Sequence, residues 1–96
     1  MNYRYGDKMT EENLSYENLK NANLSFVDLI DADLSGADLR GADLIDADLY
    51  HANLRFADLS NAYLTGADLI DAYLTGAHGC EKLTQISEEQ KKSVHC

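Results

Sequence analysis

The residues of this chain that could carry chemistry lie in two places. His51 stands twenty residues after Asp31 and twenty before Asp71, and such a set resembles an acid–base arrangement. Further along, two imidazoles and two thiols supply the number and kind of ligands that a zinc ion takes; they belong to His78, Cys80, His95 and Cys96. Whether either set can act depends on the elements that position it.

Those elements are set by a repeat of five residues. A leucine stands at every fifth position from Leu14 to Leu74. From Leu24 on, the residue two places before each leucine is alanine, with Val27 as the single variant. The residue directly before each leucine is Asp or Asn, except at Tyr63 and Tyr73. A repeat of this regularity is read before any other feature, because it dictates the architecture.

A period of five fits neither of the common elements. On an α-helix, successive leucines would drift by about 140° and wrap the whole surface. On a flat strand, an odd spacing would place alternate leucines on opposite faces. A chain that turns a corner every five residues keeps all leucines inside. Four such sides close a square coil of about twenty residues, and stacked coils pair at about 4.8 Å.

The segments A-D-L-S-G at 32–36, A-D-L-R-G at 37–41 and A-D-L-I-D at 42–46 resemble the pentapeptide repeat family. The resemblance covers about residues 12–81 and implies an all-β solenoid, a right-handed quadrilateral β-helix of about three to three and a half coils. It places the central leucine and the preceding small residue inside. The predicted structural core comprises Leu24, Leu29, Leu34, Leu39, Leu44, Leu49, Leu54, Leu59, Leu64, Leu69 and Leu74.

The chain is expected to form one domain with three segments. Residues 1–11 are interpreted as an N-terminal lead-in or cap, 12–81 as the β-helix, and 82–96 as a C-terminal capping helix and tail. Glu12 and Glu17 replace the inward alanine and are interpreted as marking the open lower end, because a carboxylate inside a closed core would cost several kcal/mol. Ser87–Gln90 has the S-x-x-Q pattern of a capping box, which predicts a short α-helix.

Residues twenty apart should stack in columns on the outside of the coil. One side then carries an apolar column of Ile30, Tyr50 and Ile70, flanked by five aspartates. The whole candidate interaction face is Asp28, Ile30, Asp31, Asp48, Tyr50, His51, Asp68, Ile70 and Asp71. Two interpretations stay open: side chains that only support each other along the ladder, or a contact face for a partner or a second copy.

Another column alternates large and absent side chains, and reads Tyr16, Gly36, Phe56 and Gly76. The rings can lie over the glycines of neighbouring coils, or the glycines can simply serve turns with left-handed backbone angles. Tyr63 and Tyr73 are expected to form a second aromatic area near the C-terminal end.

On this scaffold, neither the His51 set nor the set of two histidines and two cysteines is expected to carry out catalysis or to bind a metal. On an exposed flat face, His51 is expected to lack a pocket, a nucleophile and an orienting group, so we interpret it as a partner that relieves acidic repulsion. The spacings of His78, Cys80, His95 and Cys96 match no usual zinc finger, and a Cys80–Cys96 disulfide or two free thiols are the alternatives. The sequence contains no phosphate loop and no nucleophile elbow. We expect no enzyme, no metal and no cofactor.

Charge and hydropathy limit which classes of partner and which location are expected for this protein. The chain has 96 residues, with 17 acidic against 8 basic side chains and a net charge of −9. Direct binding to nucleic acid or to acidic membranes is therefore disfavoured. No apolar run approaches a membrane span, and Met1–Thr10 lacks the apolar core of a signal peptide. We expect a cytoplasmic protein.

Two functions follow as hypotheses. The first is a non-catalytic structural or protein-interaction module that presents flat acidic faces to a protein partner or to its own copy, as in a homodimer. The alternative is a DNA mimic that inhibits or protects a DNA-binding enzyme such as gyrase, a role that the resemblance implies for some members of the family. The predicted rod is short for that role.

Overall fold

A computed structural model describes residues 8–79 of the chain. The predicted C-terminal helix, the capping box and Cys80, His95 and Cys96 lie outside these residues. So do residues 1–7 of the predicted N-terminal lead-in. The structural statements below therefore concern 8–79.

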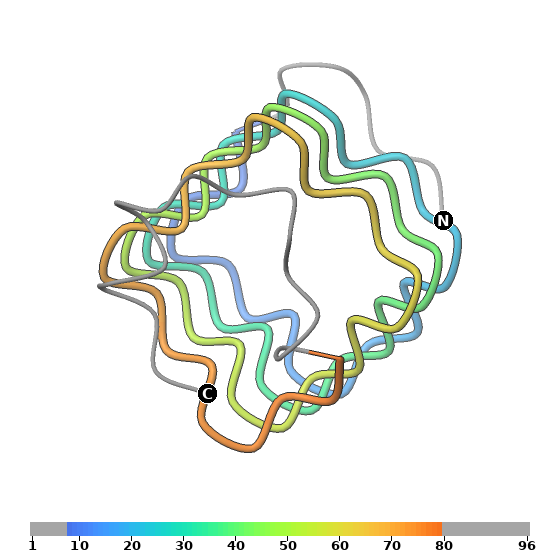
Figure 1. Ribbon diagram of the computed structural model, residues 1–96. Coiled ribbons are helices and arrows are strands. Elements are labelled where there is room, and N and C mark those ends of the chain that lie inside the picture. Colours follow the sequence, from blue (N-terminus) through green and yellow to red (C-terminus); the bar gives the residue numbers. More distant parts are fainter. Residues whose placement is uncertain (1–7, 80–96) are drawn as a thin grey trace.

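The described chain forms stacked coils around a square outline (Figure 1). Eleven parallel β-bridges join residues that are twenty apart, from Lys8 with Asp28 to Asp58 with His78. Each bridge is a single residue pair, and within 8–79 there is neither an α-helix nor a longer strand. The period of twenty predicted from the leucines is therefore the observed register.

The bridges define four sides, which we number in chain order. Side 1 carries the bridge residues 8, 28, 48 and 68, and side 2 carries 13, 33, 53 and 73. Side 3 carries 18, 38, 58 and 78, and side 4 carries 23, 43 and 63. Residues 8–11 already follow this pattern, since Met9 N–H donates to the Asp28 carbonyl at 2.7 Å.

Each group of five residues satisfies its backbone donors in the same way, as the stretch Leu29–Asp33 illustrates. Two N–H groups, of Leu29 and Asp31, donate to carbonyls of the coil above at 2.8 and 3.1 Å. Asp33 N–H donates to the coil below at 2.8 Å, and Ala32 N–H closes the corner on the Leu29 carbonyl at 3.0 Å. The Ile30 N–H is the one donor of the five without a carbonyl partner. It needs a side-chain acceptor, because a buried or half-buried donor without a partner is costly.

Every corner has its third residue at positive φ, as in a type II turn. The ten non-glycine residues in this conformation have φ between 57° and 63°. Asp, Asn and His tolerate this region better than other side chains. They fill six of the ten corners: Asn21, Asp31, Asp46, His51, Asn61 and Asp71. The remaining four are Glu11, Tyr16, Phe26 and Phe56.

The core contains only leucine, alanine and one valine, Val27. All eleven leucines predicted for it are at most 3% exposed. Met9 and Ala77 pack against its two ends. Glu12 is exposed and Glu17 is half-buried, and among the described residues no polar or charged side chain is buried. The carboxylates that replace alanine thus avoid the closed core, as expected.

Both interpretations of the aromatic–glycine column hold. Gly36 and Gly76 have φ of +67° and +75°, so these corners use the left-handed region. A Cβ on Gly36 would lie 2.6 Å from a ring carbon of Tyr16, and one on Gly76 would lie 2.6 Å from a ring carbon of Phe56. The rings therefore cover the glycines of the next coil.

Candidate functional site

The nine residues of the predicted interaction face lie on side 1 and its corner towards side 2. The register stacks Asp28, Asp48 and Asp68 directly above one another. Tyr50 is 42% exposed and Ile70 39%, whereas Ile30 is half-buried. The column of Ile30, Tyr50 and Ile70 is thus accessible along its length.

The three stacked aspartates have a structural task that the sequence reasoning missed. Asp28 Oδ1 accepts the Ile30 N–H at 3.0 Å, Asp48 Oδ1 the Tyr50 N–H at 3.1 Å, and Asp68 Oδ1 the Ile70 N–H at 2.9 Å. The N–H group accepted in each case is the fifth backbone donor of its repeat, the one that has no carbonyl partner. The signal was present in the sequence, because both Asp and Asn occupy this position and what they share is a side-chain oxygen that accepts a hydrogen bond.

The expectation that His51 lacks an orienting group is wrong. Its Nδ1 lies 2.6 Å from Asp31 Oδ1, and its Nε2 lies 3.1 Å from the Tyr73 hydroxyl. With the hydrogen on Nδ1, the imidazole donates to Asp31 and Nε2 accepts from Tyr73. The corner at φ of +60° turns His51 towards the same column as Asp31, which brings the two side chains together. The predicted pairing of His51 with an acidic neighbour is therefore observed.

Tyr73 connects this pair to side 2. Its ring packs edge-on against His51, with centroids 5.3 Å apart, and the Arg55 guanidinium carbon lies 4.3 Å from the Tyr73 ring centroid. Tyr63 lies on side 4, half a coil away, so the expected aromatic area of Tyr63 and Tyr73 does not form. Neither tyrosine keeps the Asp or Asn acceptor of the repeat.

The network of Asp31, His51, Tyr73 and Arg55 is open to solvent. The His51 and Asp31 side chains are 46% and 42% exposed. General acid–base or nucleophilic catalysis needs a site that excludes water and holds donors for developing charge. The four side chains lie close to one another, but the His51 and Asp31 side chains are open to water.

Side 3 carries a bidentate ion pair between Arg40 and Asp38. The Arg40 guanidinium donates to both oxygens of Asp38, at 2.8 and 2.6 Å, and its Nε lies 3.9 Å from Asp58. The hydrogen bonds from Arg40 lower the pKa of Asp38 to about 2. The Ser35 and Ser60 hydroxyls, each donating at 2.6 Å, lower the pKa of Asp33 and Asp58.

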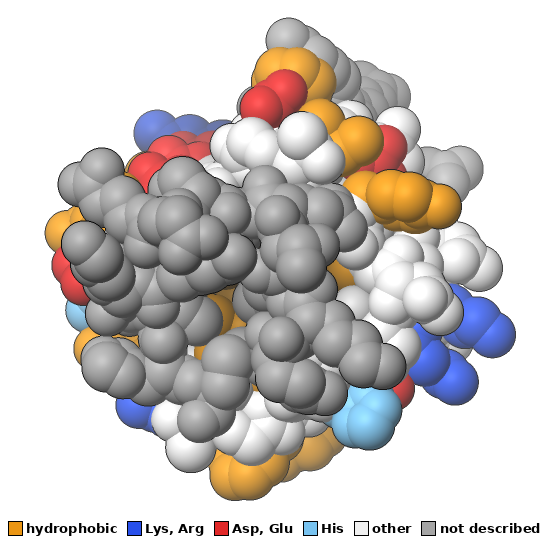
Figure 2. Space-filling model, in the orientation of Figure 1, with side chains coloured by type: hydrophobic (Ala, Val, Ile, Leu, Met, Phe, Trp, Pro, Cys, Tyr) orange, Lys and Arg blue, Asp and Glu red, His pale blue; other side chains and the backbone are white. Residues whose placement is uncertain are grey.

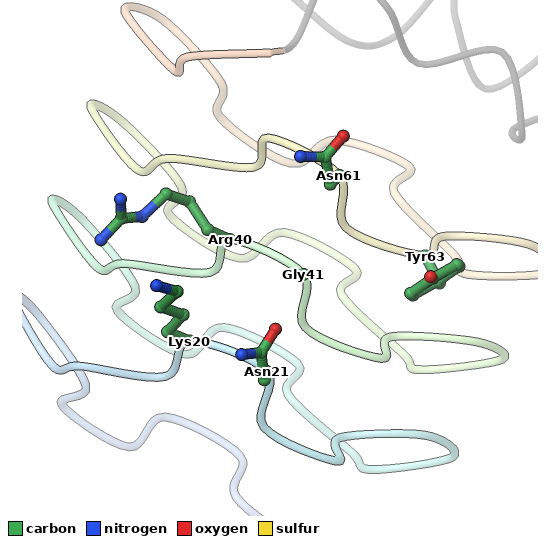
Figure 3. A pocket seen from close by; sticks show the side chains of 6 residues that line it. All are labelled: Lys20, Asn21, Arg40, Gly41, Asn61 and Tyr63. Atoms are coloured by element: carbon green, nitrogen blue, oxygen red, sulfur yellow. The ribbon is translucent and has the colours of Figure 1, made fainter.

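A groove of about 430 Å³ lies at the corner between sides 3 and 4 (Figure 3). Its lining consists of Lys20, Asn21, Arg40, Gly41, Asn61 and Tyr63. Sequence reasoning did not single out this set, because its members are spread over three coils and belong to different columns.

Side chains of each kind are distributed around the coil rather than segregated to one half (Figure 2). Among residues 8–79, no group of three or more His, Cys, Asp or Glu side chains could hold a metal ion. Of the four His and Cys residues considered as zinc ligands and judged unsuitable by their spacing, only His78 lies within that range. Within the same residues there is no helix long and apolar enough to cross a membrane.

Comparisons with known proteins agree with the observed repeat. The model of the family described as pentapeptide repeats matches residues 18–55 and 42–78, with 8 copies of the repeat. No curated protein matched the chain.

Solved structures give similar folds. A pentapeptide repeat protein from the cyanobacterium Cyanothece 51142 is 40% identical over 80% of this chain and 52% of its own, with a TM-score of 0.78. One from the thylakoid lumen of Arabidopsis thaliana is 36% identical over 79% of this chain and 52% of its own, with a TM-score of 0.76.

A third similar structure is a pentapeptide repeat protein from Nostoc Pcc 7120. It is 34% identical over 98% of this chain and 74% of its own, with a TM-score of 0.78. The present chain therefore spans about half of the first two proteins and about three quarters of the third.

Proposed function

Because the chain belongs to the pentapeptide repeat family, whose members are right-handed quadrilateral β-helices, we propose that it is a non-catalytic interaction module. It presents side 1 to a protein partner or to a second copy of itself. We further propose that the coil closes with a short helix from the C-terminal segment 82–96, giving three to three and a half coils. A cytoplasmic location belongs to the same proposal.

The observation that carries the proposal is the exposed apolar column on side 1. Ile30, Tyr50 and Ile70 stand in register on three successive coils. Single exposed apolar residues are ordinary on soluble proteins, but an apolar centre with a polar rim is typical of contact surfaces. The rim here consists of five aspartates, so the face of a different protein partner should carry an apolar ridge bordered by Lys or Arg, whereas in a dimer through side 1 the aspartates of the two copies would repel each other.

The backbone favours a preorganised surface. The side-chain acceptors Asp28, Asp48 and Asp68 hold the N–H groups of the three apolar residues in place. A face whose backbone is already fixed loses little conformational entropy when it binds. This supports docking of a rigid partner surface rather than capture of a disordered peptide.

The test replaces the two outer residues of the column by Ile30→Asp together with Ile70→Asp. The matched control is Ile45→Asp, the same residue type at the same place in the repeat on side 4. Light scattering with and without reductant should show a smaller solution mass for the double variant only, if the partner is a second copy. If the protein is a monomer, cross-linking to a partner should be lost in the double variant and kept in the control. If mass and cross-linking are unchanged in the double variant, the assignment of side 1 is wrong.

Charge density favours the DNA-mimic hypothesis as a second candidate. Residues 8–79 hold 13 acidic and 4 basic side chains, hence a net charge of 4 − 13 = −9. Three and a half coils at about 4.8 Å span about 17 Å, or one negative charge per about 2 Å, against about 1.7 Å in duplex DNA. The same 17 Å corresponds to only about five base-pair steps of about 3.4 Å, which ranks this candidate second. A gyrase supercoiling assay without inhibition at micromolar protein would exclude it for that enzyme.

A further inference from the structure

We propose that the groove at the corner between sides 3 and 4 binds a small organic oxyanion, a phosphate or carboxylate group attached to a planar ring. The groove lies away from side 1, so this inference is independent of the function proposed above.

The shape depends on Gly41. This residue occupies a corner at φ of +67°, between Asn21 on the coil below and Asn61 on the coil above. A Cβ on Gly41 would collide with the Asn21 side-chain oxygen, so only glycine at this corner lets the Asn21 amide keep its place in the lining of the groove. Figure 3 shows the two asparagines below and above this floor, with Lys20 and Arg40 to one side and Tyr63 to the other. A volume of about 430 Å³ is within the range of small-molecule sites.

The lining favours a ligand that accepts hydrogen bonds. In a chain with 17 acidic residues, none of the six lining residues is Asp or Glu. Lys20, Arg40, the two asparagine amides and the Tyr63 hydroxyl are all donors. The backbone N–H groups of Asn21 and Gly41 already donate to the Arg40 and Ser60 carbonyls at 2.9 Å. Binding must therefore use the side chains.

Lys20 supplies a positive charge that forms no close ion pair, and its charge contributes to the lowered pKa of the nearby Asp38 carboxyl. The Arg40 guanidinium is neutralised by Asp38 and lies near Asp58, and its bidentate contact leaves three of its five N–H donors for another acceptor. No carboxylate lies within the 4.0 Å ion-pair distance of the Lys20 ammonium among the residues that the structure describes. The Lys20 ammonium and the remaining Arg40 N–H donors come from adjacent coils, and together they suit an anion with several oxygens.

Tyr63 provides the wall that a planar ring would need. It replaces the Asp or Asn of the repeat on side 4, stands in register with Asp43, and is 55% exposed. Aromatic rings pack favourably in offset or edge-on arrangements. An oxyanion at Lys20 and Arg40 with a ring against Tyr63 would use both walls of the groove.

The test is a titration of the full ¹⁵N-labelled chain with phenyl phosphate, benzoate and inorganic phosphate, followed by NMR. We expect shifts of the Asn21 and Asn61 side-chain amides and of the Gly41 amide with phenyl phosphate or benzoate. The tighter of these two identifies the oxyanion as phosphate or carboxylate. Inorganic phosphate, which has no ring, should bind more weakly than phenyl phosphate.

Three variants separate the contribution of charge to binding from the contribution of the shape of the groove. Lys20→Gln should weaken binding by about fivefold, the upper range for one exposed charge pair. Gly41→Asn keeps every charge and tolerates positive φ, but its side chain would displace the Asn21 amide that lines the groove, so it should abolish binding. The control Arg55→Gln removes one positive charge on side 2 and should leave binding unchanged. Circular dichroism verifies that each variant is folded.

The proposal is overturned if none of the probes shifts these amides at millimolar concentration. It is equally overturned if Arg55→Gln weakens binding as much as Lys20→Gln, or if Gly41→Asn binds like the parent chain. Inorganic phosphate that binds as tightly as phenyl phosphate would overturn the role of Tyr63.

Discussion

At the scale of single residues, the Asp or Asn before each leucine is the part of the repeat with the least obvious purpose. Its side-chain oxygen accepts the N–H of the residue two places on, as in Asp43 Oδ1 with Ile45 N–H at 3.0 Å. The other four donors of the repeat bond to carbonyls. The position is therefore a backbone requirement first and a surface charge second.

Asp43→Ala should lower the free energy of unfolding by about 1 kcal/mol, because it leaves the Ile45 N–H without its acceptor. Asp43→Asn keeps the oxygen and should cost much less. Urea unfolding followed by circular dichroism measures both. Equal losses in the two variants would contradict the assignment of the side chain as an acceptor.

The Asp38–Arg40 pair predicts an acid-sensitive contribution to stability. The pKa of Asp38 is lowered to about 2 in the folded protein, against about 3.9 in an unfolded chain. A lowered carboxyl pKa stabilises the fold above the unfolded value, and this contribution is lost as the pH falls from about 4 to about 2. Because the pair is exposed, solvent screens it and the effect is modest.

Arg40→Gln should raise the titration midpoint of the Asp38 carboxyl towards its ordinary value. Carbon-13 NMR of the carboxyl groups measures this directly, and Asp33, which bonds to Ser35 instead, is the internal reference. A midpoint of Asp38 that stays near 2 in the variant would show that Arg40 is not the cause.

At the scale of the element, the unit is a corner of five residues rather than a strand. Only one residue of each five forms a β-bridge, and the next corner begins at the leucine that directly follows it. The corner places leucine and alanine inside and exposes the remaining positions to different degrees. The small inward residue matters because the square coil has little interior space beyond the leucines.

Ala52→Leu should destabilise the protein by about 1–3 kcal/mol or more, because Ala52 is 0% exposed and a larger side chain overpacks the core. Thr75→Leu adds a similar side chain at an exposed position and should cost little. Thermal melting compares the two variants. If the melting temperature of Ala52→Leu equals that of the parent chain, the interior is less tightly packed than the structure indicates.

At the scale of the whole molecule, stacking puts like charges in register. Asp28, Asp48 and Asp68 follow one another on successive coils, and the chain carries a net charge of −9. Salt should therefore raise the melting temperature, because raising the ionic strength from about 0.01 M to about 1 M shortens the Debye length from about 30 Å to about 3 Å.

The matched control is the triple variant Asp28→Asn, Asp48→Asn and Asp68→Asn, which keeps the backbone acceptors and removes the stacked charges. Its melting temperature should depend less on salt than that of the parent chain. If both proteins respond equally to salt, repulsion within this column does not limit stability.

The sequence by itself determined the interior of this protein. A leucine every fifth residue and a small residue two places earlier admit only a chain that turns at regular corners, and the coil of twenty follows from four sides. The placement of Glu12 and of the rings over Gly36 and Gly76 could be inferred in the same way. These predictions succeed because each depends on a register that the repeat imposes.

The tertiary structure decided which outward side chains meet. Asp31, His51 and Tyr73 join across a corner, and Lys20, Arg40 and Tyr63 line one groove, although no local pattern links them. Such contacts depend on side-chain directions at the corners and on which position lacks a side chain, as at Gly41. The repeat sets positions on the coil every five residues, but it does not set how long polar side chains turn once they reach the surface.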